Sequence, residues 1–489
     1  MSIHRFEFAT CQPRFARSAA TLLVAALVCS TALAQLAPGD SNTAAAWRAT
    51  SRLGYAPTAA SAQAAQADPK GWALKQIDAA HAASQRPANI PADLAPFNQS
   101  INQIALAMRA SKQARIATKK LTPEQQKEEK MAMAGAEDPS KYAGEMQQGV
   151  ATWRLMSCSN PAMEQALLSK MTEFWFNHLN VYTRKDRVRP YLGNYVIEVI
   201  RPNALGKFED LLLASARHPA MLFYLDQVQS NARGLNENYA RELMELHTLG
   251  VNTVYTQKDV RELARILTGW TVDTPHDEGF RFVEKSHDQG EKVLLGKKFP
   301  PGGVREGEEA IRMLARHPAT AQRIATRLAT TFVADKPSKA LVDSLAATFS
   351  KTQGDIRAVM RTLVESPEFW RAENTLFKTP LDYACSALTA GGGIREPREV
   401  QLTLNFLQQA GQPMHGWQTP DGYKTDAATW LAPEALTRRA DYAIAISGKM
   451  PEPTYLAPFL SKASRERIAR EAPAARTGLT LASPDFMSK

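Results

Sequence analysis

The sequence predicts a mainly helical protein, a multi-helix orthogonal array with one small β-hairpin insertion. Apolar residues recur at spacings of three and four over most of the chain, which is the period of a helix that buries one face. Asn-Pro and His-Pro pairs stand where such segments begin, as proline is favoured at a first helical position. Predicted strands do not alternate with helices along the sequence, so a parallel sheet is not expected.

The first 34 residues have the pattern of a secretory signal peptide. Three arginines precede the apolar run Ala19–Leu33, and a small-x-small site ends at Ala34, so cleavage is expected after Ala34. The apolar run is too short for a membrane span, and none is expected after cleavage. We therefore predict a periplasmic or secreted protein.

The rest of the chain is expected to form two parts. Residues 35–390 are predicted to be a helical main domain, and residues 391–489 a C-terminal helical extension packed on it, because three consecutive glycines begin at Gly391. Residues 110–149 are rich in Lys, Gln and Glu, with poor apolar periodicity. They predict a mobile, lysine-rich insertion within the main domain.

Several local patterns define individual elements. Asn160-Pro161 predicts the start of a strong helix. His218-Pro219 and His317-Pro318 predict two further helix starts. Only Phe280–Val283 and Lys292–Leu295 are β-prone, and they are predicted to pair as the one hairpin.

Charge and cysteine content limit the classes of partner. The formal net charge is +10 for the full chain; without the three arginines and Glu7 of the predicted signal peptide it is 10 − 2 = +8. On an exported protein this charge suggests an acidic polysaccharide, a phosphate-rich envelope or anionic lipid as a partner, or it serves solubility alone. No zinc-finger spacing or long basic helix indicates nucleic acid. After signal cleavage Cys158 and Cys385 remain; both a disulfide and two free buried thiols are open.

The densest run of chemically capable side chains is Gly234–Val251, predicted to be one helix with Asn236 as its N-cap. When successive residues are placed about 100° apart around the helix axis, the three glutamates lie in one sector together with an arginine and an asparagine. The members of this sector are Glu237, Asn238, Arg241, Glu242 and Glu245. His247 falls on another side. The sector is either a catalytic carboxylate cluster, whose pKa values are pushed apart, or a solvated Glu237–Arg241–Glu245 ladder.

Two other motifs carry histidine. In FWFNH, Asn177 precedes His178, which continues an apolar stripe; it is either a core histidine or a group at the rim of a pocket. His287 and Asp288 lie in the loop of the predicted hairpin and can contact a polar ligand or a metal ion.

Several of these segments resemble the bacterial domain of unknown function 1800 family. The similar segments are FWFNH at 174–178, HPAMLFYLD at 218–226, LNENYARELMELHTLGV at 235–251, HDQGEKVLLG at 287–296, GDIRAVMRTLVESPEF at 354–369 and TPDGY at 419–423. The resemblance is collinear, and the insertion at 110–149 departs from it. It implies an exported, mainly helical protein, often encoded beside a second exported protein, and it implies no established reaction.

The favoured hypothesis is a periplasmic or secreted carboxylate-dependent hydrolase or lyase acting on a polysaccharide. Glu242 and Glu245 are the predicted acid/base pair, with Arg241 and His178 as further catalytic residues. The predicted substrate contacts are Asn177, Asn236, Glu237, Asn238, His287 and Asp288. The alternatives are a non-catalytic binding or assembly partner of another exported protein, and a divalent-metal enzyme with His178, His287 and Asp288 as ligands. No GxSxG, P-loop, HExxH or dinucleotide-binding motif is present, so the sequence assigns no cofactor and no metal site.

Overall fold

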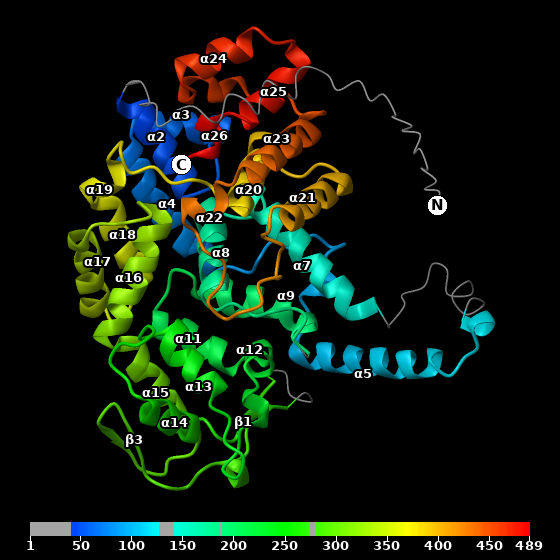
Figure 1. Ribbon diagram of the computed structural model, residues 1–489, viewed down its shortest axis with the longest axis vertical. Coiled ribbons are helices and arrows are strands. Elements are labelled where there is room, and N and C mark those ends of the chain that lie inside the picture. Colours follow the sequence, from blue (N-terminus) through cyan, green and yellow to red (C-terminus); the bar gives the residue numbers. More distant parts are fainter. Residues whose placement is uncertain (1–40, 127–140, 186, 274–278) are drawn as a thin grey trace, which may run out of the picture. The chain divides into compact units, whose positions relative to one another are not determined.

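The computed structural model describes residues 41–126, 141–185, 187–273 and 279–489 (Figure 1). The predicted signal peptide and residues 127–140 of the predicted insertion lie outside these ranges. Helices dominate, as predicted. Among the helices described, none combines the length and apolar content that a bilayer span requires.

The first half of the chain is helical up to Ile266. Its helices are α2 (Ser41–Arg52), α3 (Ala59–Ala67), α4 (Pro69–Ser84), η1 (Ala95–Phe97), α5 (Ile101–Thr118), α7 (Tyr142–Ser159), α8 (Ala166–His178), η3 (Arg189–Tyr191), α9 (Leu192–Asn194), η4 (Tyr195–Ile200), α10 (Arg201–Asn203), α11 (Phe208–Arg217), α12 (Pro219–Tyr224), η5 (Gln227–Gln229), α13 (Asn238–Glu242), η6 (Leu243–His247) and α14 (Gln257–Ile266).

The second half returns to helix after a β-region. Its helices are η7 (Glu284–Ser286), α15 (Val304–Arg316), α16 (Pro318–Phe332), α17 (Lys339–Lys351), α18 (Ile356–Glu365), α19 (Pro367–Trp370), α20 (Pro380–Ala390), α21 (Pro397–Gln409), α22 (Ala427–Trp430), α23 (Pro433–Ser447), η8 (Thr454–Phe459), α24 (Lys462–Ala469), α25 (Pro473–Leu481) and α26 (Pro484–Met487). Helices α16, α17 and α18 pack side by side (Figure 1).

Helix starts follow the local capping chemistry. Both His-Pro predictions are confirmed: α12 and α16 begin at the proline, and the preceding His218 and His317 accept an N–H of the first turn through the ring. The prediction at Asn160-Pro161 is wrong. Asn160 ends α7, and its side chain accepts only the Ala162 N–H in a turn. Helix α8 begins five residues after Pro161, capped by the Gln165 side chain.

Both β-prone runs are strands, but they do not pair with each other. β1 (Trp270–Val272) pairs antiparallel with β2 (Phe280–Phe282). β3 (Lys292–Leu294) pairs antiparallel with β4 (Lys297–Phe299). The described chain therefore has two small hairpins here, because each run finds a partner close in sequence, with Gly296 at a φ of 80° in the second turn.

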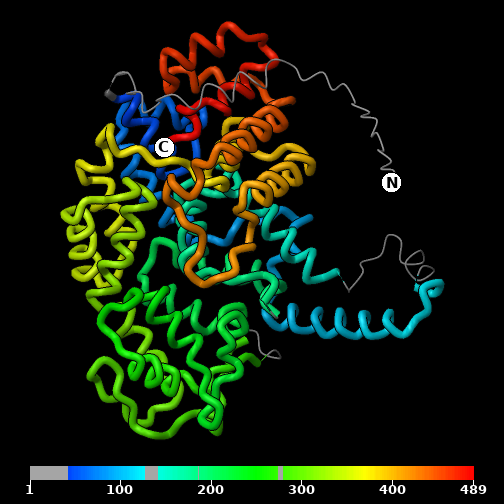
Figure 2. The backbone as a smooth tube through the Cα atoms, in the orientation of Figure 1, coloured from blue at the N-terminus to red at the C-terminus, as the bar shows by residue number. Residues whose placement is uncertain are grey.

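Two apolar cores organise the helices. The larger one surrounds α8, α11 and α16. The second core joins the two ends of the described chain: Trp47 on α2 contacts Phe459 and Phe486, with ring centroids 5.6 and 6.3 Å apart. Figure 2 shows this meeting of early and late segments. The segment after residue 390 therefore shares its core with the N-terminal helix.

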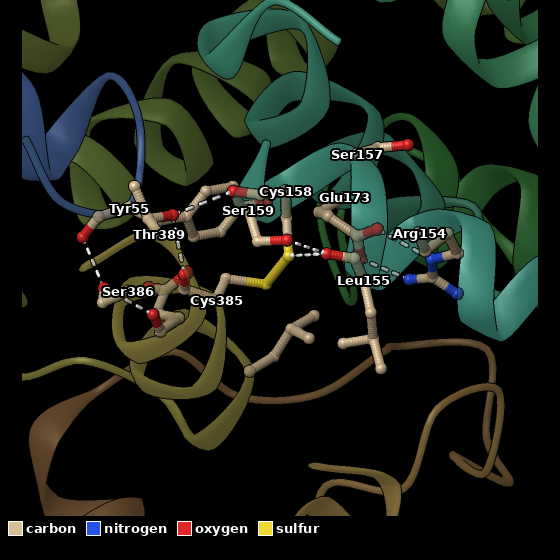
Figure 3. The surroundings of a disulfide bond; sticks show 12 residues. Tyr55, Arg154, Leu155, Ser157, Cys158, Ser159, Glu173, Cys385, Ser386 and Thr389 are labelled. Atoms are coloured by element: carbon tan, nitrogen blue, oxygen red, sulfur yellow. Dashed lines mark hydrogen bonds and ion pairs between the residues drawn. A yellow bond between two sulfur atoms is a disulfide. The ribbon is translucent and has the colours of Figure 1, made fainter. Parts of the chain in front are cut away.

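A disulfide joins Cys158 at the end of α7 to Cys385 on α20 (Figure 3). Both residues belong to the second core. Thr389 lies beside the bond and donates a hydrogen bond to the Cys385 carbonyl oxygen at 2.8 Å. The sequence left open a disulfide or two free thiols, and the structure contains the disulfide. This bond holds α20 against α7.

Candidate functional site

The predicted site helix exists but is not regular. Five residues of α-helix (α13) run directly into the π-helical turn η6. Asn236 lies one residue before the N-cap position, and its side chain accepts the Asn238 N–H at 2.9 Å. Asn238 in turn donates to the Leu225 carbonyl oxygen. The predicted N-cap at Asn236 is thus wrong by one position, and both asparagines have structural hydrogen bonds.

Three residues of the carboxylate sector form the Glu237–Arg241–Glu245 ladder, which was the alternative to a catalytic cluster. Arg241 lies 3.3 Å from the Glu237 carboxylate and 3.5 Å from that of Glu245. It also donates to Gln257 on α14 at 2.9 Å, and Gln257 donates to Glu237 at 2.7 Å. These partly exposed groups satisfy one another. The structure does not leave Arg241 free to bind a substrate.

Glu242 differs from its neighbours. It is half-buried, and within the described residues its carboxylate has no hydrogen-bond or ion-pair partner. Burial, the charge of Glu245 and the charge of Asp421 raise its pKa, against the lowering effect of Arg241. A proton on Glu242 is therefore retained to higher pH than on an ordinary glutamate.

Asp421, which the sequence analysis did not single out, is the carboxylate from a second element. Trp417 and Thr419 both donate to its Oδ1, at 2.8 and 2.5 Å. Asn180, just after α8, donates to the carbonyl oxygens of Trp417 and Thr419. The loop at 417–423 is therefore fixed against the end of α8, and its carboxylate has a defined direction.

Asn177 is a support of this loop. Its side chain donates to the Tyr423 carbonyl oxygen at 2.8 Å and accepts the Tyr423 N–H at 2.7 Å. Gly422 packs so closely that an added Cβ would lie 2.0 Å from the Asn177 carbonyl oxygen. The asparagine predicted to bind substrate is thus occupied by the protein's own backbone.

His178 is buried in the core and not at a pocket rim. Its Nε2 lies 3.0 Å from the His247 carbonyl oxygen, so this nitrogen is the donor. Its Nδ1 and the Nε2 of His247 are buried without a hydrogen-bond partner in the described part of the chain. Burial, with the nearby Arg327 and Arg323, lowers the pKa of His178 well below its usual range. His178 is therefore a neutral core residue, which is the alternative that the sequence left open.

His287 and Asp288 belong to a different cluster. His287 contacts the Thr268 carbonyl oxygen at 2.8 Å and Glu306 at 3.0 Å. Asp288 accepts two hydrogen bonds from Arg265, at 2.8 and 3.1 Å. These bonds fasten the β3 region to α14 and α15. His178, His287 and Asp288 are not brought together, and no group of three His, Cys, Asp or Glu side chains in the described residues is placed to hold a metal ion.

A cavity of about 300 Å³ lies beside α8. Its walls come from α8, α16, the start of α20 and the loop that precedes α22. Asp421 lines it, together with residues that local sequence patterns did not reveal. Those discussed below are Arg154, Lys170, Glu173, Arg327, Asp382, His415 and Lys489.

Asp382 at the start of α20 is shared by two buried lysines. Lys170 of α8 and Lys489 each donate to a different oxygen of its carboxylate. These two ammonium groups hold the pKa of Asp382 far below its usual range, although burial opposes them. Burial lowers the pKa of Lys170 to about 7. One end of the cavity is therefore a buried, charged cluster.

Arg154 and His415 form another wall. Arg154 donates to Glu173 at 2.7 Å through Nε, and its Nη1 lies 3.2 Å from both ring nitrogens of His415. Burial and the guanidinium charge lower the pKa of His415 well below its usual range. His415 has a φ of 58°, a left-handed conformation that is uncommon for a residue with a Cβ. The imidazole is held neutral in a constrained loop.

Arg327 of α16 lines the cavity on the side of Asp421. No hydrogen bond or ion pair of its guanidinium occurs among the described residues. Burial and the neighbouring Arg323 lower its pKa to about 10, with Asp421 acting in the opposite direction. Arg327 therefore keeps its charge at neutral pH without a contacting counter-ion.

Fold and site together define a mainly helical protein with a charged internal cavity and one half-buried carboxyl group of raised pKa nearby. The chain belongs to the family described as Protein of unknown function (DUF1800), whose model matches residues 48–488. No curated protein and no solved structure matches the chain.

Proposed function

We propose that the chain is an exported enzyme that cleaves a polysaccharide by proton transfer, as a hydrolase or a lyase, with Glu242 as the principal acid/base residue. The observation that carries this proposal is the carboxyl group of Glu242, half-buried, without a partner among the described residues, and under the electrostatic influence of Asp421, which lines the charged cavity. A carboxyl group with a raised pKa can hold a proton at the pH where it must donate it.

Two carboxyl groups from different elements suit this chemistry better than two on one helix. Glu242 lies on α13 and Asp421 in the loop at 417–423, so a sugar can lie between them. In a hydrolase one carboxyl group donates to the leaving oxygen and the other acts as base or nucleophile. We therefore assign the second carboxylate to Asp421, in place of Glu245, which belongs to the ladder with Arg241.

The disulfide supports export. Bonds between cysteines form and persist in the periplasm or outside the cell, and are rare in the cytosol. Cys158 and Cys385 are the cysteines that remain after the predicted signal cleavage, and they are bonded to each other. The bond thus agrees in chemistry with the proposed location.

The experiment compares the mature chain with Glu242→Gln and Asp421→Asn on a panel of neutral and acidic polysaccharides. Release of reducing ends detects both reactions, and ultraviolet absorbance of an unsaturated product detects a lyase. Each change should reduce activity by about 10²–10⁴-fold. The matched control is Glu237→Gln, which removes a ladder carboxylate and should leave most activity. A substrate cleaved equally well by wild type and Glu242→Gln would contradict the proposal.

An assembly role for another exported protein is the second candidate. Val251 and Val254, which follow η6, are 52% and 53% exposed, and we propose these two apolar side chains as the contact with such a partner. Under this role Glu242→Gln would have no effect, whereas Val251→Asp with Val254→Asp would abolish co-purification with the partner.

A further inference from the structure

The cavity beside α8 has more basic than acidic groups. Five basic and three acidic side chains line it. Two of the acidic groups are occupied within the wall, since Glu173 pairs with Arg154 and Asp382 is shared by Lys170 and Lys489. Asp421, the third, already accepts two hydrogen bonds from its own loop. The cavity is therefore electropositive after its internal pairs are counted.

Arg327 and Lys424 are the two basic lining groups that this surplus leaves without an ion pair among the described residues; Lys424 is exposed to solvent, and Arg327 is partly buried. A charged guanidinium inside a protein costs several kcal/mol of desolvation unless an anion compensates it. Its neighbours compensate it only in part: Arg323 is basic and His178 is neutral, and the one acidic neighbour, Asp421, acts on it without a hydrogen bond or ion pair and is already bonded to its own loop. Arginine presents a planar fork of N–H donors that fits two oxygens of a carboxylate, phosphate or sulfate group. An unpaired arginine in a cavity wall thus indicates a negatively charged ligand.

The far end of the cavity adds to the positive potential. Behind Asp382 lie Lys378 and Arg439, both fully buried. The Nζ of Lys378 and two guanidinium nitrogens of Arg439 have no hydrogen-bond partner among the described residues. The two lysines in front share the one carboxylate. Burial lowers the pKa of Lys378 well below its usual range, whereas Arg439, with a pKa lowered to about 10, keeps its charge at neutral pH and adds positive potential behind this end of the cavity.

We infer that this cavity binds an oxyanion group, a carboxylate or a phosphate or sulfate ester, with Arg327 as its principal contact. The volume of about 300 Å³ is at the lower limit of small-molecule sites, which span roughly 300–1,000 Å³. The enclosed part of the ligand is therefore small, such as one acidic sugar unit. The assignment of this oxyanion to a sugar rests on the proposed function. If both hold, the polysaccharide that the enzyme cleaves is acidic.

The test is isothermal titration of the mature chain with glucuronate, inorganic phosphate and sulfate, with glucose as the neutral control. We expect saturable binding of at least one oxyanion and none of glucose. Arg327→Gln should raise the dissociation constant at least about tenfold. Arg327→Lys, which keeps the charge but loses the fork, should lie between. The matched control is Arg312→Gln on α15, whose arginine pairs with Glu209 on the surface.

The Arg327→Gln variant is expected to fold, because the change removes a partly buried charge that has no ion pair and should leave the unliganded melting temperature equal or higher. Binding of glucuronate alone supports an acidic sugar, and binding of phosphate or sulfate alone supports an ester. No saturable binding of any of the three, or binding that Arg327→Gln leaves unchanged, overturns the inference.

Glu242→Gln separates this site from the proposed reaction, because it should bind the oxyanion as wild type does. If the oxyanion binds in this way but wild type cleaves no polysaccharide, the site stands and the proposed function fails. If a neutral polysaccharide is cleaved in a Glu242-dependent manner and no oxyanion binds, the function stands and the site fails.

Discussion

Replacement of both Cys158 and Cys385 by alanine should lower the free energy of unfolding by about 5 kcal/mol. The bond closes a loop with a sequence separation of 227 residues. In the chain-entropy relation the loss depends on the logarithm of loop length, which gives about 18 cal/mol/K, or about 5 kcal/mol at 25 °C. Both residues are buried, so lost packing adds to this value and does not reduce it.

The assay is unfolding in urea of residues 35–489, followed by circular dichroism, for the oxidised wild type and the double alanine variant. The matched control is the same pair in a reducing agent: wild type should fall toward the variant, and the variant should not change. A loss below about 1 kcal/mol would refute the reasoning, because it would mean that α7 and α20 stay close together in the unfolded chain without the bond.

Three further predictions concern the site. Glu242→Gln should stabilise the protein at neutral pH and not below about pH 4: the pKa of Glu242 is raised in the folded state, so its charged form costs stability only as the pH rises past the unfolded-state value. An equal effect at both pH values would contradict this. Asp382→Asn should cost about 3–5 kcal/mol, since it leaves Lys170 and Lys489 without their carboxylate. Because the pKa of Asp382 is lowered on folding, that stability is present above its unfolded value and is lost as the pH falls, so the melting temperatures of wild type and variant should converge in acid. Gly422→Ala should cost about 1–3 kcal/mol, because Gly422 has a φ of 73° and the added Cβ meets the Asn177 carbonyl oxygen; faster hydrogen exchange confined to the loop at 417–423 measures it, and unchanged exchange would contradict it.

Features that depend on near neighbours in the chain could be predicted from sequence. The helical class followed from apolar period, and the starts of α12 and α16 followed from His-Pro, because the proline and the capping ring act within one turn. The ladder of Glu237, Arg241 and Glu245 was also foreseeable, since residues four apart on a helix are neighbours. The sequence could not decide between this ladder and a catalytic carboxylate cluster, because both place the same side chains on one face of the helix.

Other features escaped local reasoning. The angular count assumes about 100° for every residue and therefore cannot detect the π turn at η6. This turn changes the directions of the side chains within η6 relative to a regular α-helix. The two β-prone runs were recognised, but their pairing was not, because each strand chose a closer partner. The apolar stripe favoured a core position for His178 but left a pocket rim open, and only its burial and its contact with the His247 carbonyl oxygen decided between them.

The sequence alone determined the helical fold class, the family resemblance and the Glu242 candidate. The tertiary structure decided that the charge of Asp421 acts on Glu242, that Asp382 binds Lys170 across 212 positions, and that Arg327 stands unpaired in a cavity wall. The physical reason is the separation along the sequence of the residues that take part in each interaction. Helix formation depends on residues within about four positions, whereas burial, pKa and ion pairing depend on whichever distant segment packs opposite.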